Sequence, residues 1–313
     1  MPNIAAISGR TVLIHVLTVG LASAALCGAG AQDVPARPPL VGAEWVHTAI
    51  AGESWATIGA REGITPAVLA ARNGRTLRSP LRAGDPIVID NRHIVPQALF
   101  APNGGGNGLV VNIPQRLIFQ YADGRLQTHY PAAVGGSDWQ TPLGVFRILV
   151  KEEGPTWDVP ESIQGEMRRT GKRVLTRVPP GPHNPLGKYW LGLSLDSVGI
   201  HGTNAPLSIY SFATHGCIRL APDDIEALYM QVSEGDIGRI IYEPVLVAYD
   251  GTDVYLEVHP DPYRRVPDLL QRALELLNAA GLTDMVEQTE VVDTVRRADG
   301  VATPITAPER RND

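Results

Sequence analysis

IHGTNAPLSIYSFATHGCIRLAPDDIEALY, residues 200–229, carries two histidines and a cysteine between a strand-like segment and a helix-like segment. The helix signals are Pro222, which is favoured in a first turn, and the acidic Asp223 and Asp224 behind it. Apolar residues then recur at helical spacing from Ile225 to Val232. The sequence therefore predicts a helix that starts at Pro222, shortly after Cys217.

Strand-like segments lie on both sides of this stretch. Asp123-Gly124 and Asp250-Gly251 are strong hairpin signals between apolar, β-forming runs. A second helix is predicted from Pro267 to Asn278, with Gly281 as its stop, and we expect a frayed tail after about residue 296. The fold class is therefore a mainly β catalytic domain with short helices, its strands predicted at 109–113, 115–121, 126–133, 144–150, 191–195, 199–201, 237–242, 245–249 and 254–258.

A smaller unit precedes this domain. Residues 46–50 and 86–89 have strand character, and residues 54–61 have helix character. Thr65-Pro66 supplies the N-cap and first turn of a second helix that runs through Arg72. The sequence predicts a compact βααβ module over residues 43–92, flanked by Pro- and Gly-rich linkers at 32–42 and 93–107.

The first 31 residues have the pattern of a secretory signal peptide. Arg10 precedes an apolar run, and the run ends in Ala29-Gly30-Ala31, an A-x-A cleavage pattern. A membrane anchor is the alternative, but the run is shorter than the roughly 20 residues that span a bilayer. We expect export to the periplasm or cell envelope, with no membrane-spanning segment after cleavage and with Cys217 as the one remaining cysteine.

The composition excludes several classes of protein. The chain has 313 residues, 44% of them hydrophobic and 19% charged, which is typical of a globular protein of two or three domains. Its 32 Gly and 26 Pro argue against a helical bundle or long coiled coil. The net charge of -6 lacks the cationic excess that nucleic acids require, so no nucleic-acid partner is expected.

A free thiol in an exported chain suggests either burial or catalytic use. A cysteine nucleophile needs a base that takes its proton and backbone N–H groups that point at the oxyanion. A neighbouring imidazole can also lower the pKa of the thiol so that it ionises. If residues 215–219 are extended, His215, Cys217 and Arg219 share one face. If the segment is a turn, only His201, sixteen positions before Cys217, needs to be close.

These residues closely resemble the signature of the L,D-transpeptidase family with the YkuD domain, H-G-(S/T) followed by (S/T)-H-G-C-x-(R/N). The resemblance extends from Leu109 to about Pro260. It is clearest in VVNIPQRLIFQYADG (110–124), TPLGVFRI (141–148), PGPHNPLGKYWLGLS (180–194) and the opening stretch, which are similar to the subgroup represented by ErfK, YbiS, YcfS and YnhG. It implies a YkuD-like β-sandwich for residues 108–262.

The resemblance also implies roles for individual residues. Cys217 would be the nucleophile, His201 the general base, and the amides of Gly216 and Cys217 the oxyanion donors. His215 would complete the catalytic group, and Arg219 would meet a carboxylate of the donor peptide. Three further motif residues, expected to shape or bind substrate, are Thr214, Gly202 and Thr203.

The implied reaction begins with attack of Cys217 on the carbonyl between meso-diaminopimelate and the terminal D-alanine of a tetrapeptide stem. D-Alanine leaves, and the thioester passes to an amine of another stem, giving a 3→3 cross-link, or to a lysine of an envelope lipoprotein. The expected partners are thus peptidoglycan peptides and glycan, and no cofactor is implied. Residues 46–89 closely resemble the LysM module, which implies binding of N-acetylglucosamine-containing glycan.

Three other functions remain open from the residues alone. One is an exported cysteine peptidase or carboxypeptidase that hydrolyses wall peptides. Another is a metal site of His201, His215 and Cys217, although we expect no metal because the set lacks a carboxylate. The third is a non-catalytic wall-binding protein. The polar residues 151–178 are predicted to form a lid or long loop beside the site, and the C-terminal part, residues 263–313, is predicted as the second helix and a flexible tail.

Overall fold

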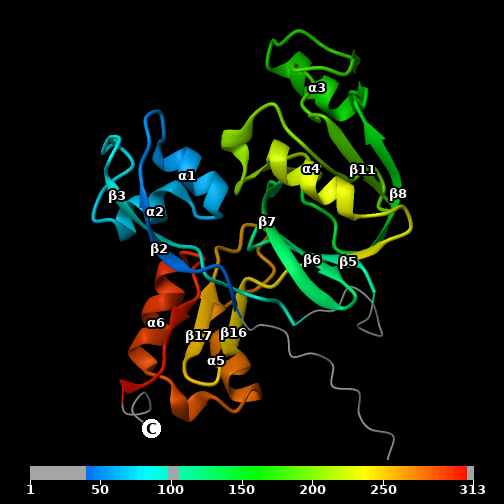
Figure 1. The fold of residues 1–313 in the computed structure, drawn as a ribbon. Coiled ribbons are helices and arrows are strands. Elements are labelled where there is room, and N and C mark those ends of the chain that lie inside the picture. Colours follow the sequence, from blue (N-terminus) through cyan, green and yellow to red (C-terminus); the bar gives the residue numbers. More distant parts are fainter. Residues whose placement is uncertain (1–39, 98–105, 309–313) are drawn as a thin grey trace, which may run out of the picture. The chain divides into compact units, whose positions relative to one another are not determined.

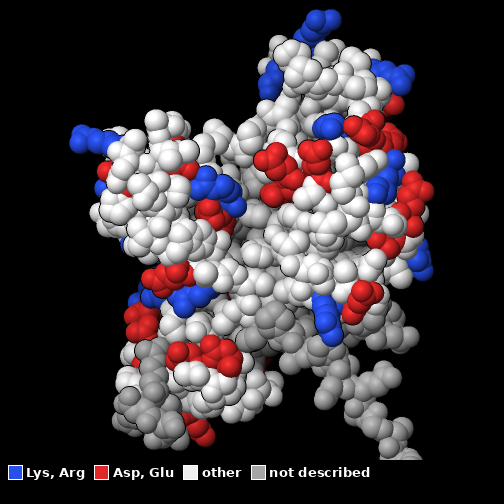
Figure 2. Space-filling view, viewed as in Figure 1, with Lys and Arg blue, Asp and Glu red and all other residues white. Residues whose placement is uncertain are grey.

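The computed structural model describes residues 40–97 and 106–308 (Figure 1). The predicted signal peptide, Cys27, and parts of both linkers lie outside these residues. Among the described residues, no helix is both long and apolar enough to cross a membrane. On the face drawn in Figure 2, Lys and Arg side chains lie interspersed with Asp and Glu.

The βααβ arrangement predicted for the N-terminal module is confirmed. It comprises β2 (Glu44–Thr48), α1 (Trp55–Glu62), α2 (Pro66–Arg72) and β3 (Pro86–Asp90), and β2 pairs with β3 in antiparallel register. Ser54 and Thr57 form a capping box that fixes the start of α1. The helices pack an apolar core against the two strands, with Ile58 and Ile87 fully buried. Two short strands, β1 (Leu40–Val41) and β4 (His93–Ile94), flank the module and pair with each other.

A nine-stranded sheet forms the centre of the mainly β domain, as predicted. Its strand order is β13-β7-β14-β12-β11-β8-β15-β5-β6, and a further pairing between β6 and β7 closes the strands from β7 to β6 into a ring, with β13 paired to β7 outside it. Asp123 and Gly124 both have positive φ, as a two-residue hairpin between β6 and β7 requires. The strands are β5 (Gly108–Asn112), β6 (Leu117–Ala122), β7 (Arg125–Gly135), β8 (Gly144–Glu153), β11 (Tyr189–Leu193), β12 (Gly199–His201), β13 (Phe212–Thr214), β14 (Ile218–Leu220) and β15 (Ile237–Ile241).

Helix α4 (Pro222–Gln231) begins at the predicted residue and covers the core face of the sheet. Its Ile225 and Leu228 belong to the same buried cluster as Leu191, Ile200 and Ile218, each of which is fully buried. Because side chains alternate along a strand, the residues next to these core positions in each strand point to the opposite face of the sheet. That second face carries the side chains of the candidate active site described below.

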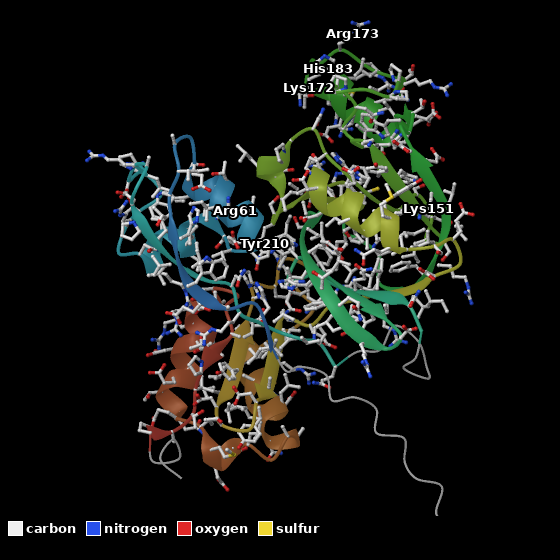
Figure 3. The ribbon with its side chains drawn as sticks, viewed as in Figure 1. Arg61, Lys151, Lys172, Arg173, His183 and Tyr210 are labelled. Atoms are coloured by element: carbon white, nitrogen blue, oxygen red, sulfur yellow. The ribbon has the colours of Figure 1, made fainter. Side chains whose placement is uncertain are left out.

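The segment 151–178 is not the long loop that we expected. It contains the end of β8, a two-stranded sheet of β9 (Trp157–Asp158) and β10 (Arg177–Val178), and helix α3 (Glu161–Arg169) between them. Lys172 and Arg173 follow α3 at the outer end of this segment (Figure 3). The position beside the site is as predicted, but the polar residues form an ordered small subdomain.

The expected frayed tail after residue 296 is wrong for the residues up to 308. A third strand, β18 (Thr303–Pro304), pairs with β17 (Val254–Val258), which in turn pairs with β16 (Val245–Tyr249). Ile305 is fully buried in a core shared with α5 (Leu269–Ala279) and α6 (Gln288–Arg297). The polar sequence of this segment gives no local signal of a strand, because its order depends on pairing with β17, which is distant in the sequence. Two single 3-10 turns complete the elements, η1 (Pro206–Ser208) and η2 (Thr283–Met285).

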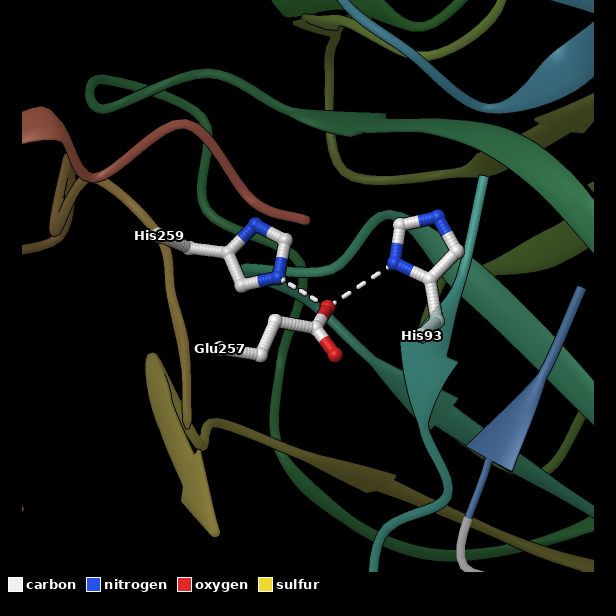
Figure 4. A group of neighbouring side chains, drawn as sticks. All are labelled: His93, Glu257 and His259. Atoms are coloured by element: carbon white, nitrogen blue, oxygen red, sulfur yellow. Dashed lines mark hydrogen bonds and ion pairs between the residues drawn. The ribbon is translucent and has the colours of Figure 1, made fainter. Parts of the chain in front are cut away.

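A buried carboxylate joins β4 to β17 (Figure 4). Glu257 lies with one oxygen 2.8 Å from His93 Nδ1 and 2.7 Å from His259 Nε2, and all three side chains are almost completely buried. Gln115 Nε2 and the amide of Ile94 also donate to this carboxylate. These donors hold the pKa of Glu257 at about 2, against the cost of burial. The carboxylate therefore links β4, the loop after β5 and the C-terminal sheet.

The same three residues are the one group of potential metal ligands that gathers within 4.8 Å in the described part of the chain. Ligands on one tetrahedral Zn²⁺ stand about 3.3 Å apart, which is wider than the two N···O distances here. The outer nitrogens, His93 Nε2 and His259 Nδ1, have no partner among the described residues, whereas metal-bound histidines donate that N–H to a second group. The geometry is that of hydrogen bonds from the two imidazoles to the carboxylate.

Candidate active site

Strands β12 and β14 bring the two sequence motifs together. They pair in parallel, with Ile200 opposite Ile218 and His201 opposite Arg219. Paired residues project on the same side of a sheet, and so do residues two positions apart. Cys217, just before β14, therefore lies on the same face as His201 and diagonal to it.

The strand register extends this arrangement into a row. Glu152 on β8 is opposite Trp190 on β11, and Trp190 is opposite His201 on β12. With Arg219 on β14, four neighbouring strands thus present a carboxylate, an indole, an imidazole and a guanidinium on one face. We name this set the site row. Glu152 and Trp190 were not among the predicted site residues, because only strand register reveals them.

His201 is held as a neutral base. Its side chain is buried, and Nδ1 lies 2.7 Å from the carbonyl oxygen of Gly202. Because a carbonyl only accepts, Nδ1 carries the proton and Nε2 keeps a free lone pair. Burial, followed by the nearby charge of Arg219, lowers the pKa of His201 to about 4. The Trp190 ring stacks on the imidazole at 5.8 Å between centroids.

The Cys217 thiol is partly exposed and lines a cavity of about 410 Å³. Burial raises its pKa, while a hydrogen bond from the Gly199 amide and the charge of Arg219 act in the opposite direction. The expectation of a thiolate ionised by a neighbouring imidazole is therefore wrong for the resting state, because desolvation outweighs the cationic neighbour. A neutral thiol beside a neutral imidazole needs proton transfer during attack.

The backbone before Cys217 is a turn, so the proposed common face of His215, Cys217 and Arg219 holds only for the last two. Gly216 has φ +108, a region that side chains other than glycine rarely adopt. Thr214 donates its hydroxyl hydrogen to the Cys217 carbonyl and accepts from the Gly216 amide at 3.3 Å. Thr214 therefore stabilises the turn itself through these two hydrogen bonds.

His215 turns away from the site row to the α3 subdomain. Its Nε2 lies 2.8 Å from Glu166 on α3, and its ring is 5.1 Å from that of Trp139. The side chains of His215 and Glu166 are each about one-third exposed, so their ion pair contributes little to the stability of the fold. This contact ties α3 to the loop that carries Cys217.

Arg219 is a partly buried cation with one polar partner. Nη1 donates to the Ser208 hydroxyl at 2.8 Å, and Nε has no partner within the described ranges 40–97 and 106–308. None of the ion pairs found among those residues involves Arg219. Burial lowers its pKa, the direction expected of a cation without a carboxylate. Beside it, the buried Thr203 hydroxyl accepts from the Ala205 amide, which shapes the loop after Gly202.

The metal set considered from sequence is not formed. The His215 imidazole lies against Glu166 and not on the face that His201 and Cys217 share, so the three side chains do not surround one point. No grouping of His201, His215 and Cys217 occurs among the potential ligand clusters of the described residues.

Gly199 gives the site its tight packing. A Cβ at this position would lie 2.3 Å from the Trp190 ring. We expect Gly199→Ala to displace Trp190 from His201 and to lower the free energy of unfolding by about 1–3 kcal/mol, as overpacking does. Urea unfolding followed by tryptophan fluorescence measures this loss. Gly165→Ala, on α3, provides a contrast, because its Cβ would meet only the Arg169 guanidinium at 3.8 Å, an ordinary contact distance.

Comparison with known proteins places this site in a family. The model of the YkuD L,D-transpeptidase catalytic domain matches residues 106–247. The YkuD protein of Bacillus subtilis (strain 168), named as an L,D-transpeptidase, is 30% identical over 184 residues, which cover 59% of this chain and 91% of that protein. The chain belongs to the YkuD family of L,D-transpeptidases.

Longer relatives match as well. The protein YcfS of Escherichia coli (strain K12), also named as an L,D-transpeptidase, is 31% identical over 214 residues. The match covers 64% of this chain and 66% of YcfS, slightly less than two thirds of its length. A solved L,D-transpeptidase from Mycobacterium smegmatis is 24% identical, with a TM-score of 0.35 over 44% of this chain and 58% of that one. This structural likeness is partial.

Proposed function

We propose that this protein is an exported peptidoglycan L,D-transpeptidase with Cys217 as its nucleophile. The observation that carries the proposal is the parallel pairing of β12 with β14, which puts His201 and Cys217 on one face while the thiol opens into a cavity. Family membership supplies the substrate class, a tetrapeptide stem that ends in D-alanine.

The first half-reaction forms a thioester. Cys217 Sγ attacks the carbonyl carbon before D-alanine, and His201 Nε2 takes the thiol proton. The oxyanion is stabilised by the amides of Gly216 and Cys217, the former being released from its long bond to Thr214. The carbon–nitrogen bond then breaks, and the proton on His201 passes to the leaving D-alanine amine.

The second half-reaction transfers the acyl group. An amine of a second stem attacks the thioester, gives its proton to His201, and expels the Cys217 sulfur, which recovers that proton. A 3→3 cross-link results. An envelope lipoprotein lysine is the alternative acceptor, and water would make the protein a carboxypeptidase.

Two binding roles accompany the chemistry. The guanidinium of Arg219, whose Nε has no partner among the described residues, suits a carboxylate of the donor peptide, because buried charges need partners. We assign glycan binding to the βααβ module because it resembles LysM, and retention in the periplasm or cell envelope because residues 1–31 resemble a signal peptide.

A product assay tests the proposal. The purified protein is incubated with a disaccharide-tetrapeptide, and products are followed by mass spectrometry. D-Alanine release, an acyl adduct on Cys217 and a 3→3 dimer are expected, and Cys217→Ala should abolish all three. Tripeptide without dimer would instead establish a carboxypeptidase. Activity that survives in Cys217→Ala, or that a chelator removes, would overturn the cysteine mechanism.

A further inference from the structure

The cavity beside Cys217 has an unusual balance of charge for a site that must also bind carboxylates. Its lining includes two carboxylates, Glu152 and Asp158, and no Lys or Arg. The indole side chains of Trp157 and Trp190 also line it. An apolar wall with two anionic groups suits an alkyl chain that ends in an ammonium.

The site row gives this cavity a direction. Glu152 stands at one end of the row and Arg219 at the other, with Trp190 and His201 between them. Neighbouring strands are about 4.8 Å apart, so three spacings separate the anionic and cationic ends by about 14 Å. A substrate that carries both an ammonium and a carboxylate can then bind in one orientation only, with its reacting carbonyl beside Cys217 at the Arg219 end of the row.

The two carboxylates come from different elements of the α3 side of the site. Glu152 is on β8, and Asp158 is on β9, where Arg177 of β10 lies 3.4 Å from it. Both members of that ion pair are about 70% exposed, so the interaction of Asp158 with Arg177 is weak. Glu152 makes no ion pair within the described residues. Both groups are thus available to a ligand.

We propose that Glu152 and Asp158 form an ammonium-binding subsite that determines substrate specificity at the Cys217 cavity. This inference rests on the proposed function and deepens it. The ammonium can belong to the diamino acid of the acyl donor or to the amine-bearing acceptor, since both are alkylammonium groups. The two sources share the same recognition chemistry and differ in the step that they affect.

Binding measurements test the subsite without requiring turnover. In the Cys217→Ala background, the Kd of a diaminopimelate tetrapeptide, the donor, and of the tripeptide, the acceptor, is measured by calorimetry. The same peptides with an acetylated side-chain amine are the uncharged probes. We expect E152Q/D158N to weaken binding of at least one free amine about tenfold and to leave its acetylated form unchanged. The wild-type preference for the free amine should disappear in the variant.

Kinetics then identify the source. If the donor supplies the ammonium, E152Q/D158N in the Cys217-containing protein slows the first release of D-alanine at low donor concentration. If the acceptor supplies it, D-alanine release is unchanged, and the KM for the acceptor rises about tenfold. In either case, raising the salt concentration should weaken wild-type binding more than variant binding.

Glu153→Gln is the matched control. Glu153 follows Glu152 on β8 but points to the other face, where it lies 3.5 Å from Lys188. The inference is overturned if E152Q/D158N binds both free amines as tightly as the parent, or if Glu153→Gln weakens binding equally. A protein that forms no product but still prefers the free amine would disprove the proposed function and retain the subsite.

Discussion

Replacing His201 by alanine is expected to slow acylation of Cys217 about 10²–10⁴-fold. His201 Nδ1 is hydrogen-bonded to the Gly202 carbonyl, which leaves Nε2 as the nitrogen that can accept the thiol proton. The resting thiol is neutral, so attack without this base requires a proton transfer to water. The rate of D-alanine release in a single turnover measures the effect.

His215→Ala is the control for the loss of an imidazole near Cys217. His215 contacts Glu166 and Trp139 and does not lie in the site row, so its removal should lower the rate less than tenfold. Equal losses in the two variants would contradict the assignment of His201 as base.

The pH profile of the wild-type protein gives an independent measure. Because the pKa of His201 is lowered to about 4, the imidazole remains unprotonated, and able to act as a base, down to that pH. We expect the acidic limb of kcat/KM near pH 4. A limb at the ordinary histidine pKa of 6.5 would mean that another imidazole, or an exposed His201, controls the reaction.

Replacing Glu257 by alanine is expected to lower the free energy of unfolding by about 3–5 kcal/mol, because removal of a buried charge strands its partners. Four buried donors face this carboxylate: the amide of Ile94, Gln115 Nε2, His93 Nδ1 and His259 Nε2. Urea unfolding measures the loss. Glu275→Ala, on the exposed side of α5, should change stability by less than about 0.5 kcal/mol.

The Glu257 contribution depends on pH in a defined direction. Its pKa is about 2 in the folded protein, against an ordinary value of 4.5. The unfolded chain therefore takes up this proton first, so the stabilisation is fully present above about pH 4.5 and is lost as the pH falls toward 2. Glu257→Gln should remove this part of the acid sensitivity. If its stability falls between pH 4.5 and 2 as steeply as that of the wild type, the carboxylate is not ionised in the fold.

Local signals were sufficient for much of the secondary structure. Strands 245–249 and 254–258 have the predicted boundaries, and the helix begins at the predicted Pro222, because the Asp250-Gly251 turn and the helix-start residues mark these positions directly. The segment from 297 to 308 lacked such signals. Its order comes from β18 pairing with β17 and from the burial of Ile305, which are tertiary contacts.

The residues of the candidate site likewise fall into those that the sequence predicts and those that only the strand register reveals. The motif residues Cys217, His201 and Arg219 could be predicted because they are close in sequence and fit a family pattern. Glu152 and Trp190 enter only through the register of β8 and β11. The protonation state of Cys217 also depended on the fold, because desolvation at the sheet surface raises the thiol pKa against nearby positive charge.

The closed ring of strands has a consequence for how this enzyme family could vary. Insertion of one residue into β11 would turn Trp190 toward the core and Leu191 toward the substrate, since the side-chain period of a strand is two. A length change that shifts the register at Trp190 thus disrupts the site row, whereas the irregularity between Gly192 and Leu193 leaves that register intact. Substrate choice can instead change through point substitutions at the ends of the site row or through changes in the α3 subdomain. Neither kind of change alters the strand register that positions Cys217.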